Sequence, residues 1–297
     1  MYTRISSAMA SFCRNMPLEA AMRMVKDAGF DGVDFPLNVF SSTPDSPMQK
    51  ENWRDWVREV KHLSETLGLP IVQAHATWEQ EIPEGFRYEA PYEVYFRSIE
   101  ACAMLGCTDL IFHPLRQPER VDSIQLRQRI HDYNVRWFYD LVPTAERCGV
   151  VINLENTFDS HRTQKPGDLP YPYTTAQDML DLMNDIGGNH VRICLDTGHA
   201  NISAQDIPEM IRIFGRDLST VHLNDNYGRI EPVYEDLHLF PGYGRIEWAP
   251  VFRALREVGF RGSYNIEPIG ELKRVPDQIR KIQLRAAAET LRALIEG

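Results

Sequence analysis

Short apolar runs rich in β-branched and aromatic residues alternate along the whole chain with segments of helical periodicity. From Trp53 to Leu67, apolar side chains recur at three- and four-residue spacing, as on the buried face of an amphipathic helix. Many helical segments end at a glycine directly before the next apolar run, which is typical of a helix-to-strand turn. The apolar runs predict strands at Ile5–Ala10, Gly32–Phe35, Ile71–His75, Asp109–His113, Val150–Glu155, Val191–Asp196, Thr220–Leu223 and Ser263–Glu267.

Eight predicted strands, each followed by a helix, favour an α/β fold with a parallel sheet. We predict a single (β/α)8 barrel, a TIM barrel, that forms one domain over residues 1–297. The alternative topology is an open, doubly wound sheet, which usually carries a glycine-rich phosphate loop after its first strand. The sequence contains neither G-x-G-x-x-G nor G-x-x-x-x-G-K-[ST], so we expect no nucleotide cofactor.

Ionisable side chains stand at the ends of six consecutive predicted strands, from the third to the eighth. The carboxyl ends of the strands form the functional face of such a barrel. A single histidine there is usually a hydrogen-bonded structural residue, and a single Asp or Glu is usually a helix cap. Chance is a poor explanation for such residues at six consecutive strand ends. All six are of types that bind metal ions: His75, His113, Glu155, Asp196, His222 and Glu267.

The string Asp196-Thr197-Gly198 also occurs in aspartic proteases, where two copies supply two carboxyl groups that share one proton. This sequence has one copy, and it lies inside a strand–helix pattern. We therefore interpret Thr197 and Gly198 as the turn that leaves the sixth strand. That turn would let His199 face the same cavity as Asp196.

The polar loop after the seventh predicted strand carries a second candidate pair, Asp236 and His238. Side chains two residues apart in an extended segment lie on the same face. Such a pair in a loop is usually a surface hydrogen bond, but this one follows a strand that ends near His222. We expect both side chains to reach the site.

The charge of the chain narrows the partners that we expect. Asp and Glu number 42 against 32 Lys and Arg, which gives a net charge of −10. This balance argues against nucleic acid and anionic membranes as partners. We find no long apolar span and no secretory signal, and the five cysteines match no zinc or redox spacing. We therefore expect a cytoplasmic protein with reduced thiols, and we leave a homo-oligomer open.

Several stretches, in this order, resemble the xylose isomerase-like barrel superfamily: "ENT", "CLDTGH", "HLND", "DLH" followed by "PGYGRIEW", and "NIEP". The resemblance extends over essentially the whole chain. This superfamily contains sugar and sugar-phosphate isomerases and epimerases, and also the endonuclease IV group. The motifs are specific for the superfamily but not for one substrate.

The resemblance implies an isomerase or epimerase of a small carbohydrate that uses one divalent ion, Mn²⁺, Mg²⁺, Co²⁺ or Zn²⁺. The ion would stabilise an enediolate formed by proton abstraction, with Glu155 and Glu267 as base and acid. The ligands that match the family are Glu155, Asp196, His222 and Glu267. We expect the substrate to contact His75, His113, His199, Arg229, Asp236 and His238.

Two alternatives remain at this point. A metal-dependent lyase or dehydratase of a keto-sugar or inositol would begin with the same proton abstraction. An endonuclease IV-like enzyme would hold three zinc ions with nine side chains, and the sequence offers a candidate for each. The loop from Thr77 to Glu93 carries several glutamates and a single arginine, which argues against a surface for DNA phosphates.

Overall fold

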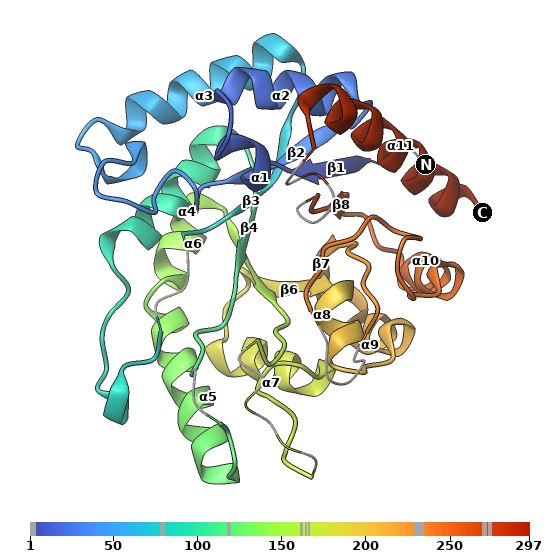
Figure 1. Ribbon diagram of the computed structural model, residues 1–297. Helices are drawn as coiled ribbons and strands as arrows, with labels where there is room; N and C mark the ends of the chain where they lie inside the picture. Colours follow the sequence, from blue (N-terminus) through green and yellow to red (C-terminus); the bar gives the residue numbers. More distant parts are fainter. Residues whose placement is uncertain are drawn as a thin grey trace.

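The computed structural model describes residues 4–77, 81–117, 120–160, 163, 165, 167–228, 235–268, 272 and 275–297. Its centre is a closed barrel of parallel strands in sequence order, in which the last strand pairs with the first (Figure 1). The predicted (β/α)8 barrel is confirmed. The strands are β1 (Ile5–Ala8), β2 (Gly32–Pro36), β3 (Ile71–His75), β4 (Asp109–Phe112), β5 (Val151–Glu155), β6 (Val191–Asp196), β7 (Leu218–His222) and β8 (Tyr264–Ile266).

Helices cover the outside of the barrel, so the strands are buried along nearly their whole length (Figure 1). No helix in the described part of the chain combines the length and the apolarity needed to cross a bilayer. The helices are α1 (Ala10–Cys13), α2 (Leu18–Asp27), α3 (Trp53–Leu67), α4 (Glu93–Leu105), α5 (Ile124–Tyr139), α6 (Val142–Cys148), α7 (Ala176–Ile186), α8 (Thr197–Ile202), α9 (Ile207–Phe214), α10 (Trp248–Glu257) and α11 (Asp277–Glu296), with 3-10 turns η1 (Pro47–Gln49), η2 (Glu84–Phe86) and η3 (Gly215–Asp217).

Glycine ends three of the helices as the sequence predicts. Gly68, Gly106 and Gly149 follow α3, α4 and α6 with φ of 59°, 79° and 66°. This left-handed conformation is strained for residues with a Cβ atom. It reverses the chain within two or three residues, so each helix leads directly into the next strand and keeps the carboxyl ends of the strands on one face.

Some strand ends differ from the prediction. β1 stops at Ala8 because α1 begins at Ala10, two residues later. β4 stops at Phe112 and β8 at Ile266, so His113 and Glu267 are the first residues beyond their strands. Both side chains still lie at the carboxyl face of the barrel, where a residue just past a strand end faces the central cavity.

Candidate metal centre and active site

A cavity of about 250 Å³ opens at the carboxyl ends of the strands. Ionisable side chains from seven different strands or the segments after them line it, together with apolar groups such as Phe158. The lining includes Asp34, His75, His113, Arg116, Glu155, His199, Asp236, His238 and Glu267. The chemically active groups predicted from separate strands therefore share one space.

Four of the predicted residues form a compact group, in which Glu155 and Glu267 line the cavity and Asp196 and His222 are fully buried beside them. Glu155, Asp196 and His222 are the last residues of β5, β6 and β7, and Glu267 follows β8. Strand register places Asp196 directly opposite His222. One potential ligand atom from each of these four side chains lies within 4.8 Å of the others. Barrel closure thus assembles the ligand set that the resemblance implies.

His222 is the centre of this group. Its Nδ1 lies 3.3 Å from Glu155 Oε1, 3.6 Å from Glu267 Oε2 and 3.9 Å from Asp196 Oδ2. The ring is fully buried, and Nδ1 has no hydrogen-bond partner among the described residues. A buried imidazole nitrogen that faces three carboxyl groups is a suitable donor set for a divalent cation. The residues present therefore fit the metal that the sequence suggests.

The electrostatics of the group agree with this fit. Burial raises the pKa of Asp196, and the nearby carboxyl groups of Glu155 and Glu267 add to that effect. Burial also raises the pKa of Glu155, but the imidazoles of His113 and His222 outweigh it and lower the pKa overall. Buried carboxyl groups packed this closely need compensating positive charge, which a divalent cation can supply.

Two further histidines approach the same glutamates from β3 and β4. His113 Nε2 lies 3.1 Å from Glu155 Oε2. His75 Nε2 lies 3.4 Å from Glu267 Oε1 and 3.8 Å from Glu155 Oε2, and its ring stacks on His222 with 4.9 Å between centroids. Both glutamates are therefore held between imidazoles as well as facing the cavity.

The segment after β6 differs from the predicted turn. Thr197 and Gly198 open a short helix, α8, whose first N–H groups are capped by Asp196: Oδ1 accepts the His199 N–H at 2.8 Å. His199 Nδ1 lies 2.8 Å from the carbonyl oxygen of Asn156, which leaves Nε2 toward the cavity. The expectation that His199 faces the site with Asp196 is therefore met, but by a helical turn.

The loop after β7 brings a second group to the cavity wall. His238 Nε2 lies 2.6 Å from Asp236 Oδ2, and His199 Nε2 lies 3.4 Å from the same oxygen. His238 Nδ1 also lies 3.3 Å from Glu267 Oε2, which joins this group to the first. Asp236 and His238 therefore both reach the site. Arg229 lies outside the described residues.

Sequence reasoning missed the amides and the carboxyl group that hold these residues. Asn224 Nδ2 donates to Asp196 Oδ2 at 2.6 Å and to Glu267 Oε2 at 2.8 Å. Asn156 accepts the Asp196 N–H at 2.7 Å and donates to its carbonyl oxygen at 3.0 Å. Asp34, in the middle of β2, lies against His75. The sequence did contain signals for these residues. Asn156 in "ENT" and Asn224 in "HLND" follow predicted strand ends, and Asp34 is a lone charged residue in the apolar run "GVDFP".

Comparison with known proteins agrees with this arrangement. Residues 22–294 match the model of a family described as the xylose isomerase-like TIM barrel. The chain belongs to this family. Its strand-end acids and histidines occupy the face where barrels of this kind carry their chemistry.

Among characterised proteins, this member of the xylose isomerase-like family is similar to a D-psicose 3-epimerase of Enterocloster bolteae. The two are 32% identical over 136 residues, which cover 45% of this chain and 38% of the epimerase. The match thus spans less than half of that relative's length.

Two solved structures share the fold across the whole chain. A D-psicose 3-epimerase with D-tagatose from Clostridium cellulolyticum H10 has a TM-score of 0.72 at 19% identity, covering 99% of both chains. A structure described as IOLI protein with a binding zinc atom has a TM-score of 0.73 at 18% identity, covering 99% of this chain and 98% of that one. At these identities the likeness shows the barrel fold.

Proposed function

We propose that this protein is a divalent-metal-dependent epimerase or isomerase of a small carbohydrate. The observation that carries the proposal is that Glu155 and Glu267, from strands that are not adjacent, face one cavity and the same buried imidazole nitrogen of His222. Two carboxyl groups at one reacting carbon can remove and return a proton. The naming of a related chain as a D-psicose 3-epimerase supports this chemistry.

Glu155, Asp196, His222 and Glu267 would hold the ion. A divalent ion there supplies Lewis-acid polarisation of a substrate carbonyl, which makes the adjacent C–H more acidic. The zinc atom named in the description of the IOLI structure supports metal binding by a barrel of this fold. The choice among Mn²⁺, Mg²⁺, Co²⁺ and Zn²⁺ is a matter for measurement, since carboxylate and imidazole ligands suit all four.

In the proposed reaction one glutamate takes the proton from the carbon beside the carbonyl, and the other returns a proton to the opposite face. The resulting enediolate links the two epimers. His199, fixed through Asn156, and His238, fixed through Asp236, would contact substrate hydroxyl groups from the wall of the cavity. We assign His75, His113 and Arg229 to the same substrate-binding role.

The size of the cavity supports a monosaccharide. Its volume of about 250 Å³ is close to the lower end of the range of small-molecule sites in proteins, about 300–1,000 Å³. A half-buried aromatic ring, Phe158, forms part of the wall and can pack against the apolar face of a sugar.

Glu155→Gln and Glu267→Gln test the proposal. The assay is proton NMR of D-psicose and other ketoses in D₂O with Mn²⁺-loaded protein, which records deuterium entry beside the carbonyl and the appearance of the epimer. We expect each variant to lose about 10²–10⁴-fold in rate with an unchanged circular dichroism spectrum. Glu209→Gln, on the exposed side of α9, is the matched control and should keep full activity. Wild-type rates in both site variants would remove these residues from the mechanism, and a dehydrated product would indicate a lyase.

One observation favours a second candidate, an endonuclease IV-like enzyme. His199, Asp236 and His238 gather ligand atoms within 4.8 Å of one another beside the first group. Metal analysis of protein purified without chelator distinguishes the two. About one divalent ion per chain supports the carbohydrate enzyme, and three zinc ions together with cleavage of abasic DNA support the nuclease.

A further inference from the structure

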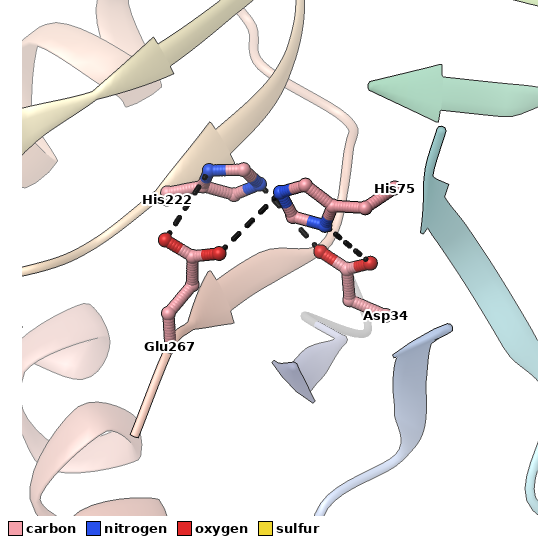
Figure 2. Close-up of side chains that lie close together, drawn as sticks. All are labelled: Asp34, His75, His222 and Glu267. Carbon is pink, nitrogen blue, oxygen red and sulfur yellow. Dashed lines mark hydrogen bonds and ion pairs between the residues drawn. The ribbon is translucent and has the colours of Figure 1, made fainter. Parts of the chain in front are cut away.

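We propose that Asp34 is a positioning residue that orients two imidazoles, the proposed metal ligand His222 and the proposed substrate contact His75; this inference rests on the proposed metal binding. Figure 2 shows the Asp34 carboxyl group beside both rings. Oδ1 lies 3.0 Å from His75 Nδ1, and Oδ2 lies 3.6 Å from His222 Nε2. A single carboxyl group therefore faces one nitrogen of each ring, while the other nitrogen of each ring faces Glu267 (Figure 2).

The surroundings of Asp34 hold its carboxyl group in place. The residue is 1% exposed. Oδ2 accepts from Gln73 Nε2 at 2.8 Å and from Asn265 Nδ2 at 3.3 Å. These partners come from β3 and β8, so three strands fix the position of one side chain. A carboxyl group held this rigidly can set the orientation of the rings that it contacts.

Asp34 can also influence which ring nitrogen of His222 carries the proton. Nδ1 faces the carboxyl groups of the metal centre, and a nitrogen that binds a cation must present its lone pair. The ring proton then belongs on Nε2. Two groups face Nε2: the Gln73 amide nitrogen at 3.1 Å and Asp34 Oδ2 at 3.6 Å. Of these two, only the carboxyl oxygen can accept a proton, because the amide NH₂ group only donates. When the ring carries its proton on Nε2, the Gln73 amide therefore donates to Asp34 Oδ2 alone, and Asp34 is the group that can favour this metal-binding tautomer.

Asp34, His75, His222 and Glu267 also bring ligand atoms within 4.8 Å, which suggests a second ion between them. The Gln73 amide argues against this. Its nitrogen lies within hydrogen-bonding distance of both Asp34 Oδ2 and His222 Nε2, so an N–H donor already occupies the space where a cation would sit. Asp34 therefore acts through the imidazoles, as an outer partner of the metal centre.

Asp34→Asn tests the inference with little change in shape. Asparagine offers one accepting oxygen and one donating NH₂ group, so it cannot accept from both rings. We expect Mn²⁺ affinity, measured by isothermal titration calorimetry on chelator-treated protein, to fall about 10–100-fold. Asp109→Asn is the control, because Asp109 accepts hydrogen bonds from Asn153 and Ser219 at the opposite end of the barrel. That variant should bind Mn²⁺ as the wild type does.

The outcomes separate this inference from the proposed function. Unchanged Mn²⁺ affinity in folded Asp34→Asn overturns the role of Asp34, and the sugar assay is unaffected by that result. A wild-type protein that binds no divalent ion overturns both proposals. If Asp34→Asn fails to fold, ¹⁵N NMR of histidine-labelled, Zn²⁺-loaded wild-type protein decides. A proton on His222 Nε2 supports the inference, and a proton on Nδ1 overturns it.

Discussion

Asp225 anchors the loop between β7 and α10, and its replacement by alanine should destabilise the protein strongly. The side chain is fully buried. Oδ1 accepts from the backbone N–H groups of Asn226 at 2.9 Å and Ile246 at 3.1 Å. Oδ2 accepts from the Gly242 N–H and from Trp248 Nε1–H, both at 3.0 Å. One carboxyl group therefore satisfies donors from both ends of the loop that carries part of the candidate site.

The size of the effect follows from these contacts. Without the local bond to Asn226 and the bond to the exposed Gly242, alanine leaves two buried donors, Ile246 N–H and Trp248 Nε1–H, with no side-chain acceptor. A buried donor without a partner costs about 1–3 kcal/mol, so the low end of that range gives about 2 kcal/mol. Most single substitutions cost less than this.

Urea unfolding followed by circular dichroism measures the loss of free energy of unfolding. Asp206→Ala is the matched control, because the exposed Asp206 caps α9 through one bond to the Glu209 N–H at 3.0 Å. Loss of such a cap costs about 1 kcal/mol. If Asp225→Ala costs no more than Asp206→Ala, the reasoning that the loop depends on this carboxyl group is refuted.

Two further predictions concern the metal centre. In chelator-treated protein, burial alone would lower the pKa of His199, but Asp196 and Asp236 raise it to about 9. This pKa lies above its ordinary value of 6.5, so protonated His199 stabilises the folded state. That contribution to the free energy of unfolding is complete below pH 6.5 and is lost as the pH rises through about 9. The urea midpoint should therefore fall over that range and fall less in His199→Gln; a flat wild-type profile would contradict this. In Gly198→Ala, the new Cβ would lie 3.1 Å from Asp196 Oδ1 and from Asn226 Nδ2. We expect the free energy of unfolding to fall by about 1–3 kcal/mol and calorimetry to show weaker Mn²⁺ binding. Wild-type values for both would show that the side chains of Asp196 and Asn226 move aside at little cost.

The periodicity of the chain, together with the absence of a glycine-rich phosphate loop, was sufficient to predict the barrel. Apolar runs separated by amphipathic segments that end at glycine leave few other ways to bury both faces of a sheet. Because a parallel barrel puts all carboxyl ends on one face, the strand-end positions of Glu155, Asp196 and His222 also predicted that these side chains would meet. These inferences needed only the order of residues along each strand.

Other features depend on contacts between distant segments and could not be predicted in this way. Gln73 and His222 lie 149 residues apart in sequence and 3.1 Å apart in space. Asp34 lies inside an apolar strand, so its role depends on which rings barrel closure and strand register place beside it. The capping of α8 by Asp196 likewise depends on side-chain geometry. The sequence by itself determined which residues stand at the functional face, while the tertiary structure decided which atoms of those residues face one another, because atomic distances follow from packing across the closed barrel.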